Sequence, residues 1–279
     1  MKCAGIVTNT QKDKSLSATK TLISELERFG FDICLSETLE KKLGIQNKTK
    51  KNIYDQDILF VLGGDGTIIS QAVALFQSGS KTPIAGVNTG KIGFLTEIEK
   101  AEIPKSVEKI SAGNFYIEKR LMLCAETGGK RYYALNEFGI VRKASAHLID
   151  VQLFVDDFLI GKFSCDGMIV SSPSGSTAYS FSAGGPIISP VARCAVITPI
   201  CAYSLNPRSI VIDSGSSVRI KALDFTENSM MIADGKTVGD ACYKTDVVIR
   251  CIEECVNFVR FTDHNFYTKL HKKLVKHTF

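Results

Sequence analysis

The pentapeptide Gly63-Gly64-Asp65-Gly66-Thr67 combines residue types that suit phosphate chemistry. Glycines let the backbone approach a phosphate closely and adopt positive φ, and backbone amides at the start of a following helix favour a bound anion. A carboxylate in such a loop would repel the phosphate, so its presence there indicates a chemical function. Asp65 could accept a proton from an attacking hydroxyl or help to hold Mg²⁺. The alternative is a structural turn, because Gly-Asp-Gly is also common in turns.

The segment NTGKIGFLTE (88–97) supplies a second tight loop after the next buried strand. Its Asn88, Gly90 and Gly93 are expected on the same sheet edge as the pentapeptide, because the carboxyl ends of parallel strands share one edge. Phe94 could offer its ring to a nucleotide base. The alternative is that Phe94 is an ordinary core residue.

The pair Asn136-Glu137 lies in the apolar run YYALNEFGIV. Buried polar side chains need hydrogen-bond partners, and a ribose or the edge of an adenine could be that partner. By itself the pair is only a weak indication of a binding site.

A long polar stretch from Asp166-Gly167 to Pro186 reads SSPSGSTAYSFSAGGP from Ser171 onwards. Its hydroxyls and exposed amides are expected at the start of a short helix near Thr177, and Tyr179 adds a ring and a phenol. A flexible linker is the alternative, but it would rarely hold aromatic residues so regularly. The stretch therefore predicts a binding segment.

These segments need a scaffold, and the first part of the chain alternates strands with helices. Strands are expected at 2–8, 31–35, 57–62 and 83–87. Helices are expected at 15–29, 68–76 and 103–112, with a lysine-rich, solvated connection at 38–53. Such alternation predicts an α/β layer with a parallel sheet.

After about residue 115 strand-like runs dominate, which suggests an all-β domain. They are 115–125, 131–141, 148–155, 158–163, 167–172, 194–200, 209–213, 217–222, 229–233 and 246–252. Asp156-Asp157 is expected as a hairpin turn, and the basic tail at 264–277 as a short helix returning to the first domain. We therefore expect an α/β Rossmann-like domain at 1–114, joined by about 256–279, and an all-β domain at 115–255.

The composition excludes several classes of protein. With 279 residues, 44% hydrophobic and 23% charged, disorder is not expected. A net charge of +5 is small for a nucleic-acid binder. No apolar run is long enough for a membrane span, and the N-terminus reads as a buried strand rather than a signal peptide. Nine cysteines without a Cys-x-x-Cys motif are expected to be reduced, in the cytoplasm.

Taken together, GGDGT, NxGxxGF, Asn-Glu, Asp-Gly and SPSGSTAYSFSAGGPI resemble the NAD kinase family in order and spacing. The segment TPICAYSL (198–205) also resembles the family pattern. Only GGDGT is shared with diacylglycerol and sphingosine kinases and, more loosely, with phosphofructokinases. The family has a Rossmann-like domain and an all-β domain with the site between them, and its members are commonly dimers or tetramers.

The resemblance implies roles for individual residues. Asp65 matches the residue thought to activate the ribose 2′-hydroxyl, Asn136 and Glu137 match contacts to the adenosine part of NAD, and Asp166 matches a contact to the nicotinamide half. The remaining expected contacts to NAD are Gly66, Phe94, His147, Ser164, Ser174, Thr177, Ala178, Tyr179, Ser180, Phe181, Ser182, Cys201 and Lys236. Gly63, Gly64, Gly66 and Thr67 are expected to form the phosphate loop.

The expected reaction is transfer of the γ-phosphoryl group of ATP, or of polyphosphate, to the NAD 2′-hydroxyl. Asp65 would accept the proton. Mg²⁺ or another divalent cation would be bound through the phosphates, and the sequence identifies no protein ligands for it. We expect no nucleic-acid or membrane partner, and a homodimer or homotetramer. The alternatives are a lipid kinase and a catalytically silent dinucleotide-binding regulator.

The chain departs from the family pattern at several positions. Ser164 stands where many members carry Arg, and in the family a basic residue there tends to accompany strict use of NAD⁺. Tyr203 replaces a frequent His, Lys236 a frequent Gln or Arg, and Thr89 and Lys91 replace the commoner Leu and Arg. These departures leave Asp65 untouched and bear on substrate preference.

Overall fold

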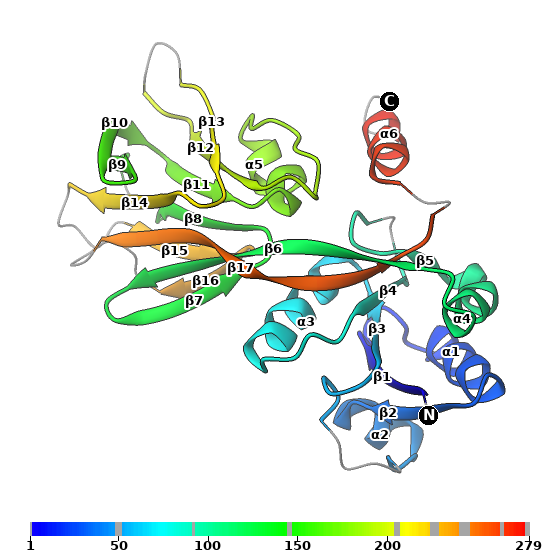
Figure 1. Ribbon diagram of the computed structural model, residues 1–279. Helices are drawn as coiled ribbons and strands as arrows, with labels where there is room; N and C mark the ends of the chain where they lie inside the picture. Colours follow the sequence, from blue (N-terminus) through cyan, green and yellow to red (C-terminus); the bar gives the residue numbers. More distant parts are fainter. Residues whose placement is uncertain are drawn as a thin grey trace. The chain divides into compact units, whose positions relative to one another are not determined.

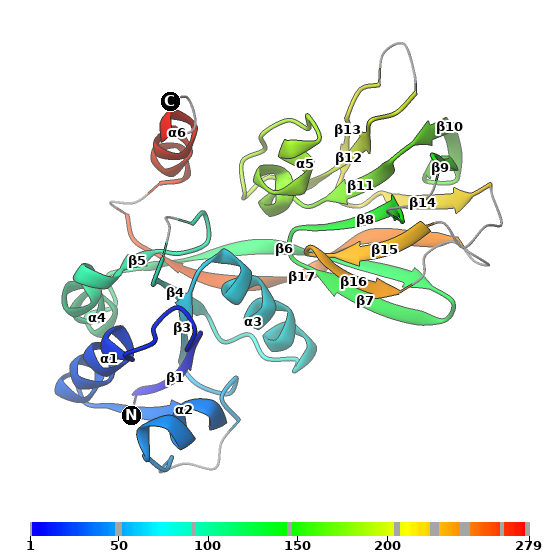
Figure 2. The same cartoon turned by 180° about the vertical axis from the view of Figure 1, so that it is seen from behind.

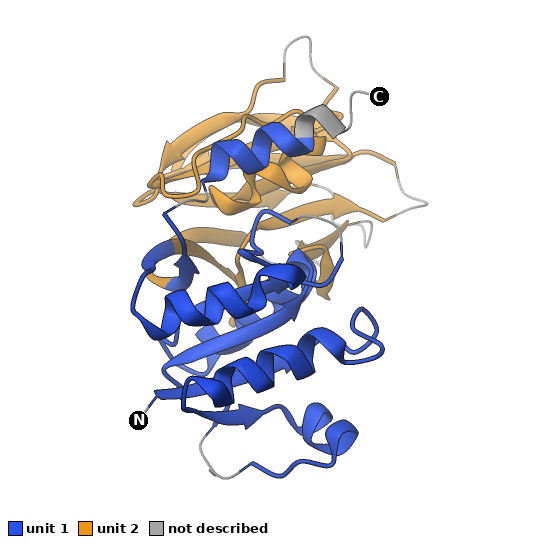
Figure 3. Ribbon diagram, turned by 90° about the vertical axis from the view of Figure 1, so that its right-hand side faces the viewer, with its two compact units in different colours: residues 1–119, 256–279 blue, residues 120–255 orange. Residues whose placement is uncertain are grey.

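The chain forms two compact units, which are coloured separately in Figure 3. The first unit comprises Met1–Lys119 and Val256–Phe279, and the second unit comprises Arg120–Cys255. The computed structural model describes residues 2–47, 52–90, 93–143, 147–203, 207–223, 229–239, 246–262 and 265–276. None of the helices in these ranges is both long and apolar enough to cross a membrane.

A parallel sheet forms the centre of the first unit, with β2, β1, β3 and β4 as successive neighbours. Its strands are β1 (Lys2–Thr8), β2 (Phe31–Leu35), β3 (Ile58–Gly63), β4 (Ile84–Asn88) and the short β5 (Ile98–Glu99) beside β4. Every residue of β3 is buried, as expected of a strand covered on both faces. Gly63 pairs with Asn88 at the carboxyl ends of β3 and β4, so the loops that follow share one edge of the sheet.

Helices cover both faces of this sheet. They are α1 (Ser17–Arg28), α2 (Glu37–Leu43), α3 (Asp65–Gln77) and α4 (Ile103–Ser111), the last preceded by the 3₁₀ turn η1 (Lys100–Glu102). Figures 1 and 2 show α3 on one side of β3 and β4, and the mutually contacting α1 and α4 on the other. The predicted parallel α/β layer is therefore confirmed.

The prediction of a solvated connection at 38–53 was wrong over its first part, which is the helix α2. This stretch is rich in lysine, yet Leu39 is fully buried in the core of the first unit. Burial of such a side chain contributes roughly 1.5–3 kcal/mol, which outweighs the weak local preference. The predicted helix in the tail is confirmed as α6 (Phe266–Lys276).

The second unit consists of two antiparallel sheets with a shared core. One sheet has the order β13-β12-β11-β8-β15-β16, and the other is the part of an 11-stranded sheet that contains β10-β9-β14-β17 together with β6 and β7. The first residues of β6 and the last residues of β17 belong to the first unit. The strands are β6 (Tyr116–Thr127), β7 (Lys130–Ala134), β8 (Glu137–Arg142), β9 (Ile149–Val155), β10 (Phe158–Cys165), β11 (Gly167–Ser171), β12 (Cys194–Ile200), β13 (Ile210–Asp213), β14 (Ser217–Ala222), β15 (Ser229–Ala233), β16 (Lys236–Gly239) and β17 (Val247–Arg260). Buried residues of both sheets, among them Leu153, Ile197 and Ile249, form one cluster. The fold class predicted from the sequence is confirmed.

Two local predictions for this unit have different outcomes. The hairpin turn at Asp156-Asp157 is confirmed, with positive φ of 49° and 67° between β9 and β10. The single strand predicted at 131–141 was wrong, because the ladder breaks at Leu135-Asn136 and forms β7 and β8. The pattern of apolar residues does not reveal the break. The break depends on Asp234, which accepts the backbone amides of Leu135 and Asn136.

Candidate functional site

Asp65 is the first residue of α3 and follows the buried strand β3 directly. Its Oδ2 accepts the backbone amide of Phe94 at 2.8 Å, and its Oδ1 accepts that of Leu95 at 3.0 Å. A negative charge at a helix N-terminus is stabilised by the helix dipole, so this carboxylate is held in place from two directions. The sequence predicted that the Asp65 loop and the Phe94 loop share one sheet edge, and the structure shows hydrogen bonds between them.

Gly93 explains how the two loops can approach so closely. A Cβ at Gly93 would overlap the Asp65 carboxylate, so a larger residue would displace it. The opposite side of the Gly63–Thr67 loop is braced by side chain and backbone, since Asn9 donates to Thr67 Oγ1 at 3.1 Å and Thr89 N donates to Gly63 O at 3.2 Å. The predicted phosphate loop is thus a fixed turn.

Phe94 is half-buried and contacts the C-terminal helix rather than forming part of the main core. Its ring lies 5.9 Å from that of Phe266, and the ammonium of Lys273 lies 3.9 Å from its centroid. The sequence left open whether Phe94 faces a base or the core, and the structure places it at the rim of the Asp65 loop. Lys91 and Ile92 of the same segment lie outside the described residues.

Two lysines that the sequence analysis did not select stand beside the phosphate loop. The ammonium of Lys12 lies against Gly64, 2.6 Å from the position that a Cβ would occupy. Lys273 Nζ lies 3.9 Å from Asp65 Oδ2. Burial lowers the pKa of Lys273, and the Asp65 charge opposes that shift. Cations at this loop suit a polyanionic ligand.

In the second unit, Asn136 and Glu137 lie where β7 passes into β8. Asp234 accepts the backbone amides of Leu135, Asn136 and Glu137 at 2.9, 2.7 and 3.2 Å. The sequence analysis selected Lys236 and missed Asp234, which precedes a glycine in the turn between β15 and β16. Its positive φ of 48° is uncommon for a residue other than glycine.

Glu137 is buried, and its Oε2 has no hydrogen-bond partner among the described residues. Burial raises the pKa of Glu137 to about 8, the Asp234 charge adds to the rise, and a hydrogen bond from the Tyr179 amide opposes it. The pKa of Asp234 is also raised by burial, against the three amides and Lys236. A buried carboxyl oxygen without a partner is costly for the fold, and a ligand hydroxyl could supply the partner of Oε2.

The hydroxyl-rich segment forms the 3₁₀ turn η2 (Ser174–Thr177) and the short helix α5 (Tyr179–Ser182). It packs against the Asn136 loop, because Ser172 N donates to Asn136 O at 2.8 Å. A Cβ at Gly175 would overlap that same carbonyl. The structure therefore brings together two segments that were selected independently in the sequence.

The side chains of this segment fall into two groups. Ser174 and Ser180 are buried, with Arg120 donating to Ser174 Oγ at 3.0 Å and Ser180 bonded to Thr198 at 2.9 Å. Tyr179 and Phe181 are exposed, as is Ser182, while Thr177 and Ala178 are half-buried. The second group can meet a ligand, and the first supports the segment.

Asp166, the expected nicotinamide contact, directly precedes β11, and Ser164, His147, Cys201 and Lys236 lie on or beside other strands of the second unit. Arg142 Nε pairs with Asp166 Oδ1 at 2.5 Å, and Tyr203 N donates to Ser164 O at 2.7 Å. Cys201 follows β12 and is exposed, with a positive φ of 46°. His147 is exposed just before β9, and Lys236 is exposed in β16. Ser204 and Leu205 of the TPICAYSL segment lie outside the described residues.

The predicted residues thus form one group in each unit. Asp65, Phe94 and the phosphate loop belong to the first unit, and Asn136, Glu137 and the 174–182 segment belong to the second. Within the described residues, no three His, Cys, Asp or Glu side chains are grouped as ligands for a metal ion.

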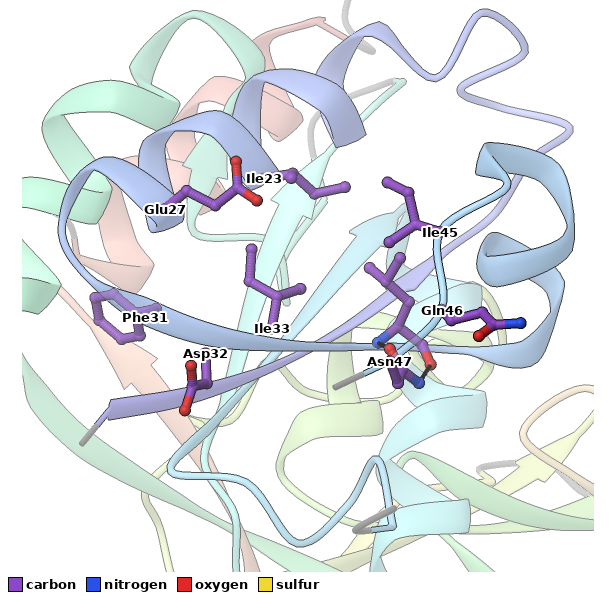
Figure 4. A pocket seen from close by; sticks show the side chains of 9 residues that line it. Ile23, Glu27, Phe31, Asp32, Ile33, Ile45, Gln46 and Asn47 are labelled. Carbon is purple, nitrogen blue, oxygen red and sulfur yellow. Dashed lines mark hydrogen bonds between the residues drawn. The ribbon is translucent and has the colours of Figure 1, made fainter. Parts of the chain in front are cut away.

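A separate hollow in the first unit contains none of the predicted residues (Figure 4). It is lined by Ile23, Glu27, Phe31, Asp32, Ile33, Leu35, Ile45, Gln46 and Asn47. The side-chain amide of Asn47 is already hydrogen-bonded to the backbone, because it accepts from Leu35 N at 2.6 Å and donates to Leu35 O at 2.8 Å. This hollow shows no arrangement suited to catalysis.

Comparison with known proteins identifies related chains along almost the whole length. The family model of the ATP-NAD kinase N-terminal domain matches residues 4–115, and that of the ATP-NAD kinase C-terminal domain matches 135–261. The NAD kinase of Caldanaerobacter subterraneus subsp. tengcongensis is 37% identical over 284 residues, covering 99% of this chain and 100% of the relative. The NAD kinase of Methanosphaera stadtmanae is 32% identical, covering 97% and 98%.

Two solved structures have the same fold. An NAD kinase from Archaeoglobus fulgidus in complex with ATP superimposes with a TM-score of 0.76 at 26% identity, covering 98% of both chains. Yeast NADH kinase complexed with NADH superimposes with a TM-score of 0.88 at 22% identity, covering 100% of this chain and 89% of that one. At that identity the second comparison establishes the fold alone.

Proposed function

Because the chain belongs to the NAD kinase family, we propose that it transfers the γ-phosphoryl group of ATP to the 2′-hydroxyl of the adenosine ribose of NAD, giving NADP and ADP. The observation that carries this proposal is the match of both family domains, together with a lone carboxylate at the start of α3.

In the proposed reaction the 2′-oxygen attacks the γ-phosphorus while the bond to the β-phosphate oxygen breaks. The proton of the hydroxyl passes to Asp65, since a neutral hydroxyl is a poor nucleophile. The amides of Phe94 and Leu95 hold the carboxylate in one orientation. Correct placement of both substrates supplies much of the remaining acceleration.

Mg²⁺ would be held through the phosphates of ATP and would neutralise part of their negative charge. Both oxygens of Asp65 already accept backbone amides, which leaves this carboxylate less free for bidentate binding of a cation. The Gly63–Thr67 loop and Lys12 would contact the phosphates. Inorganic polyphosphate is the alternative donor.

Acceptor specificity is assigned to the second unit. Asn136 and Glu137 would bind the adenosine part of NAD, and Thr177, Ala178, Tyr179 and Ser182 would line its path. Asp166 and Ser164 would lie near the nicotinamide half, and His147, Cys201 and Lys236 would also contact the dinucleotide. A lipid lacks the groups that these polar residues would recognise, so a lipid kinase is disfavoured, and a silent regulator would not need Asp65.

For assembly we propose a homodimer or homotetramer, and for location the cytoplasm. The edge strand β10 exposes Phe158, Leu159 and Ile160, with 76%, 53% and 44% of their surfaces accessible. Contiguous exposed apolar side chains mark interaction surfaces. The cysteines in the described ranges are free thiols, as in a reducing compartment.

The test is formation of NADP by the purified chain from NAD and magnesium-ATP. The same assay with polyphosphate in place of ATP decides the donor. Phosphorylation of diacylglycerol but not of NAD, or binding of NAD without turnover, would overturn the proposal in favour of one of the alternatives.

A further inference from the structure

One face of α6 is directed at the loop that holds Asp65. Phe266, Lys269 and Lys273 are spaced three and four residues apart, so they lie on the same side of the helix. Each of the three contacts the segment that follows β4 or Asp65 itself. The helix therefore presents a continuous contact surface to the candidate site within the first unit.

The middle of this face is firmly anchored. Lys269 Nζ donates to Thr96 O at 2.7 Å and pairs with Glu97 Oε2 at 2.8 Å. Glu97 is buried, and its other oxygen accepts the amide of Phe261 at 2.9 Å. The Lys269 contacts therefore hold α6 against the segment that follows β4, and they do so without Lys273.

Lys273 differs from Lys269 because its ammonium is close to charged and aromatic groups without being hydrogen-bonded to them. It lies 3.9 Å from Asp65 Oδ2 and 3.9 Å from the centroid of Phe94. Both separations exceed hydrogen-bond length. Within the described residues no hydrogen bond to this ammonium is found, so its donors can turn to a ligand oxygen.

The distances place this ammonium within reach of the reacting group. A hydroxyl that gives its proton to Asp65 lies within about 2.6–3.2 Å of the carboxylate. The phosphorus under attack lies about 3–3.5 Å from that hydroxyl oxygen. Lys273 Nζ lies 3.9 Å from Asp65 Oδ2, which is less than the sum of these two distances.

We propose that Lys273 is a catalytic residue whose ammonium binds an oxygen of the transferring phosphoryl group. The inference rests on the proposed function. As the proton moves to Asp65, that carboxylate loses its charge, and the phosphoryl oxygens become the principal anionic partner of Lys273. A preorganised cation at this point stabilises the charge that develops on those oxygens.

The competing explanation is that Lys273 only helps to fix α6. Four variants of the full chain separate the two: Lys273→Met, Lys273→Arg, Lys269→Met and Lys272→Met. Lys269→Met loosens α6 and keeps the cation at Asp65, whereas Lys272 is exposed on the same helix and serves as the control. Thermal unfolding confirms that each variant is folded.

We expect Lys273→Met to lower kcat about 10²–10³-fold with KM for NAD changed by less than roughly threefold, as for loss of a contact made in the transition state. Lys273→Arg should recover part of the rate, and Lys272→Met should match the wild type. Equal losses in Lys269→Met and Lys273→Met, or a normal kcat in Lys273→Met, would overturn the proposal. A wild type that forms no NADP would instead overturn the proposed function.

Discussion

The carboxylate of Asp234 accepts the backbone amide of Asn136 at 2.7 Å, across 98 residues of sequence. The same carboxylate also holds the amides of Leu135 and Glu137. It therefore acts as a clamp that ends β7, starts β8 and sets the direction of the Asn136-Glu137 pair.

Replacing Asp234 by Asn should weaken NAD binding about tenfold and lower the free energy of unfolding by roughly 1–3 kcal/mol. The reason is that the NH₂ group of Asn cannot accept a hydrogen bond, so one of the three backbone amides loses its acceptor. Calorimetry and chemical unfolding measure the two effects. Asp156→Asn is the matched control, since Asp156 also has positive φ and accepts an amide, that of Ser217, at 2.8 Å. Equal NAD affinity in the two variants would show that Asp234 does not support the NAD site.

Asp65→Asn should lower kcat about 10²–10⁴-fold with a modest change in NAD affinity, the range for loss of a general base. An Asn side chain can still accept one of the two amides that Asp65 accepts, so the loop should remain folded. Steady-state kinetics and NAD titration decide this. Near-normal kcat would show that Asp65 is not the base.

Asn136→Ala and Tyr179→Ala should mainly raise the dissociation constant of NAD. Tyr179 is exposed beside the Asn136 loop, where its ring is available to a ligand, and the backbone amides around Asn136 stay bound to Asp234 in either variant. Calorimetric titration with NAD measures the effect. Unchanged affinity in both variants would place the acceptor site elsewhere.

Glu137 should make stability depend on pH. Its folded pKa of about 8 lies above the unfolded value of about 4.3, so the folded state binds the extra proton. The stabilisation is present in full below about pH 4.3 and is lost as pH rises through about 8, by at most ~1.4 kcal/mol per pH unit.

Glu137→Gln removes that dependence, so its free energy of unfolding should exceed that of the wild type increasingly towards pH 8, by about 2–4 kcal/mol. Urea unfolding at a series of pH values between 5 and 8 gives the comparison, with the exposed Glu254→Gln as control. Parallel pH profiles for Glu137→Gln and the wild type would contradict the raised pKa.

Ser164 should let the enzyme use NADH better than relatives with Arg at this position, with NAD⁺ still preferred. The guanidinium of Arg142 is already paired with Asp166, two residues after Ser164. Ser164→Arg should lower the NADH to NAD⁺ ratio of kcat/KM about tenfold, or 1.4 kcal/mol. A wild type inactive with NADH, or an unchanged ratio in the variant, would refute the idea.

Sequence reasoning succeeded where the signal is local. A buried strand followed by glycines and a helix is encoded within a dozen neighbouring residues, so β3, the loop at Asp65 and α3 were predictable. The same holds for the hairpin at Asp156-Asp157. Sequence reasoning failed at α2, where the lysines suggested a solvated connection although Leu39 is buried. It also failed at the break between β7 and β8.

By itself the sequence determined the fold class, the family and the segments with polar groups suited to a dinucleotide and a phosphate. Tertiary structure alone decided that Asp234 holds the Asn136 amide, that the buried Oε2 of Glu137 has no partner among the described residues, and that Lys273 lies beside Asp65. The reason is physical: hydrogen bonds, desolvation and ion pairing depend on distances between residues remote in the chain. Those distances exist only once the sheets have packed.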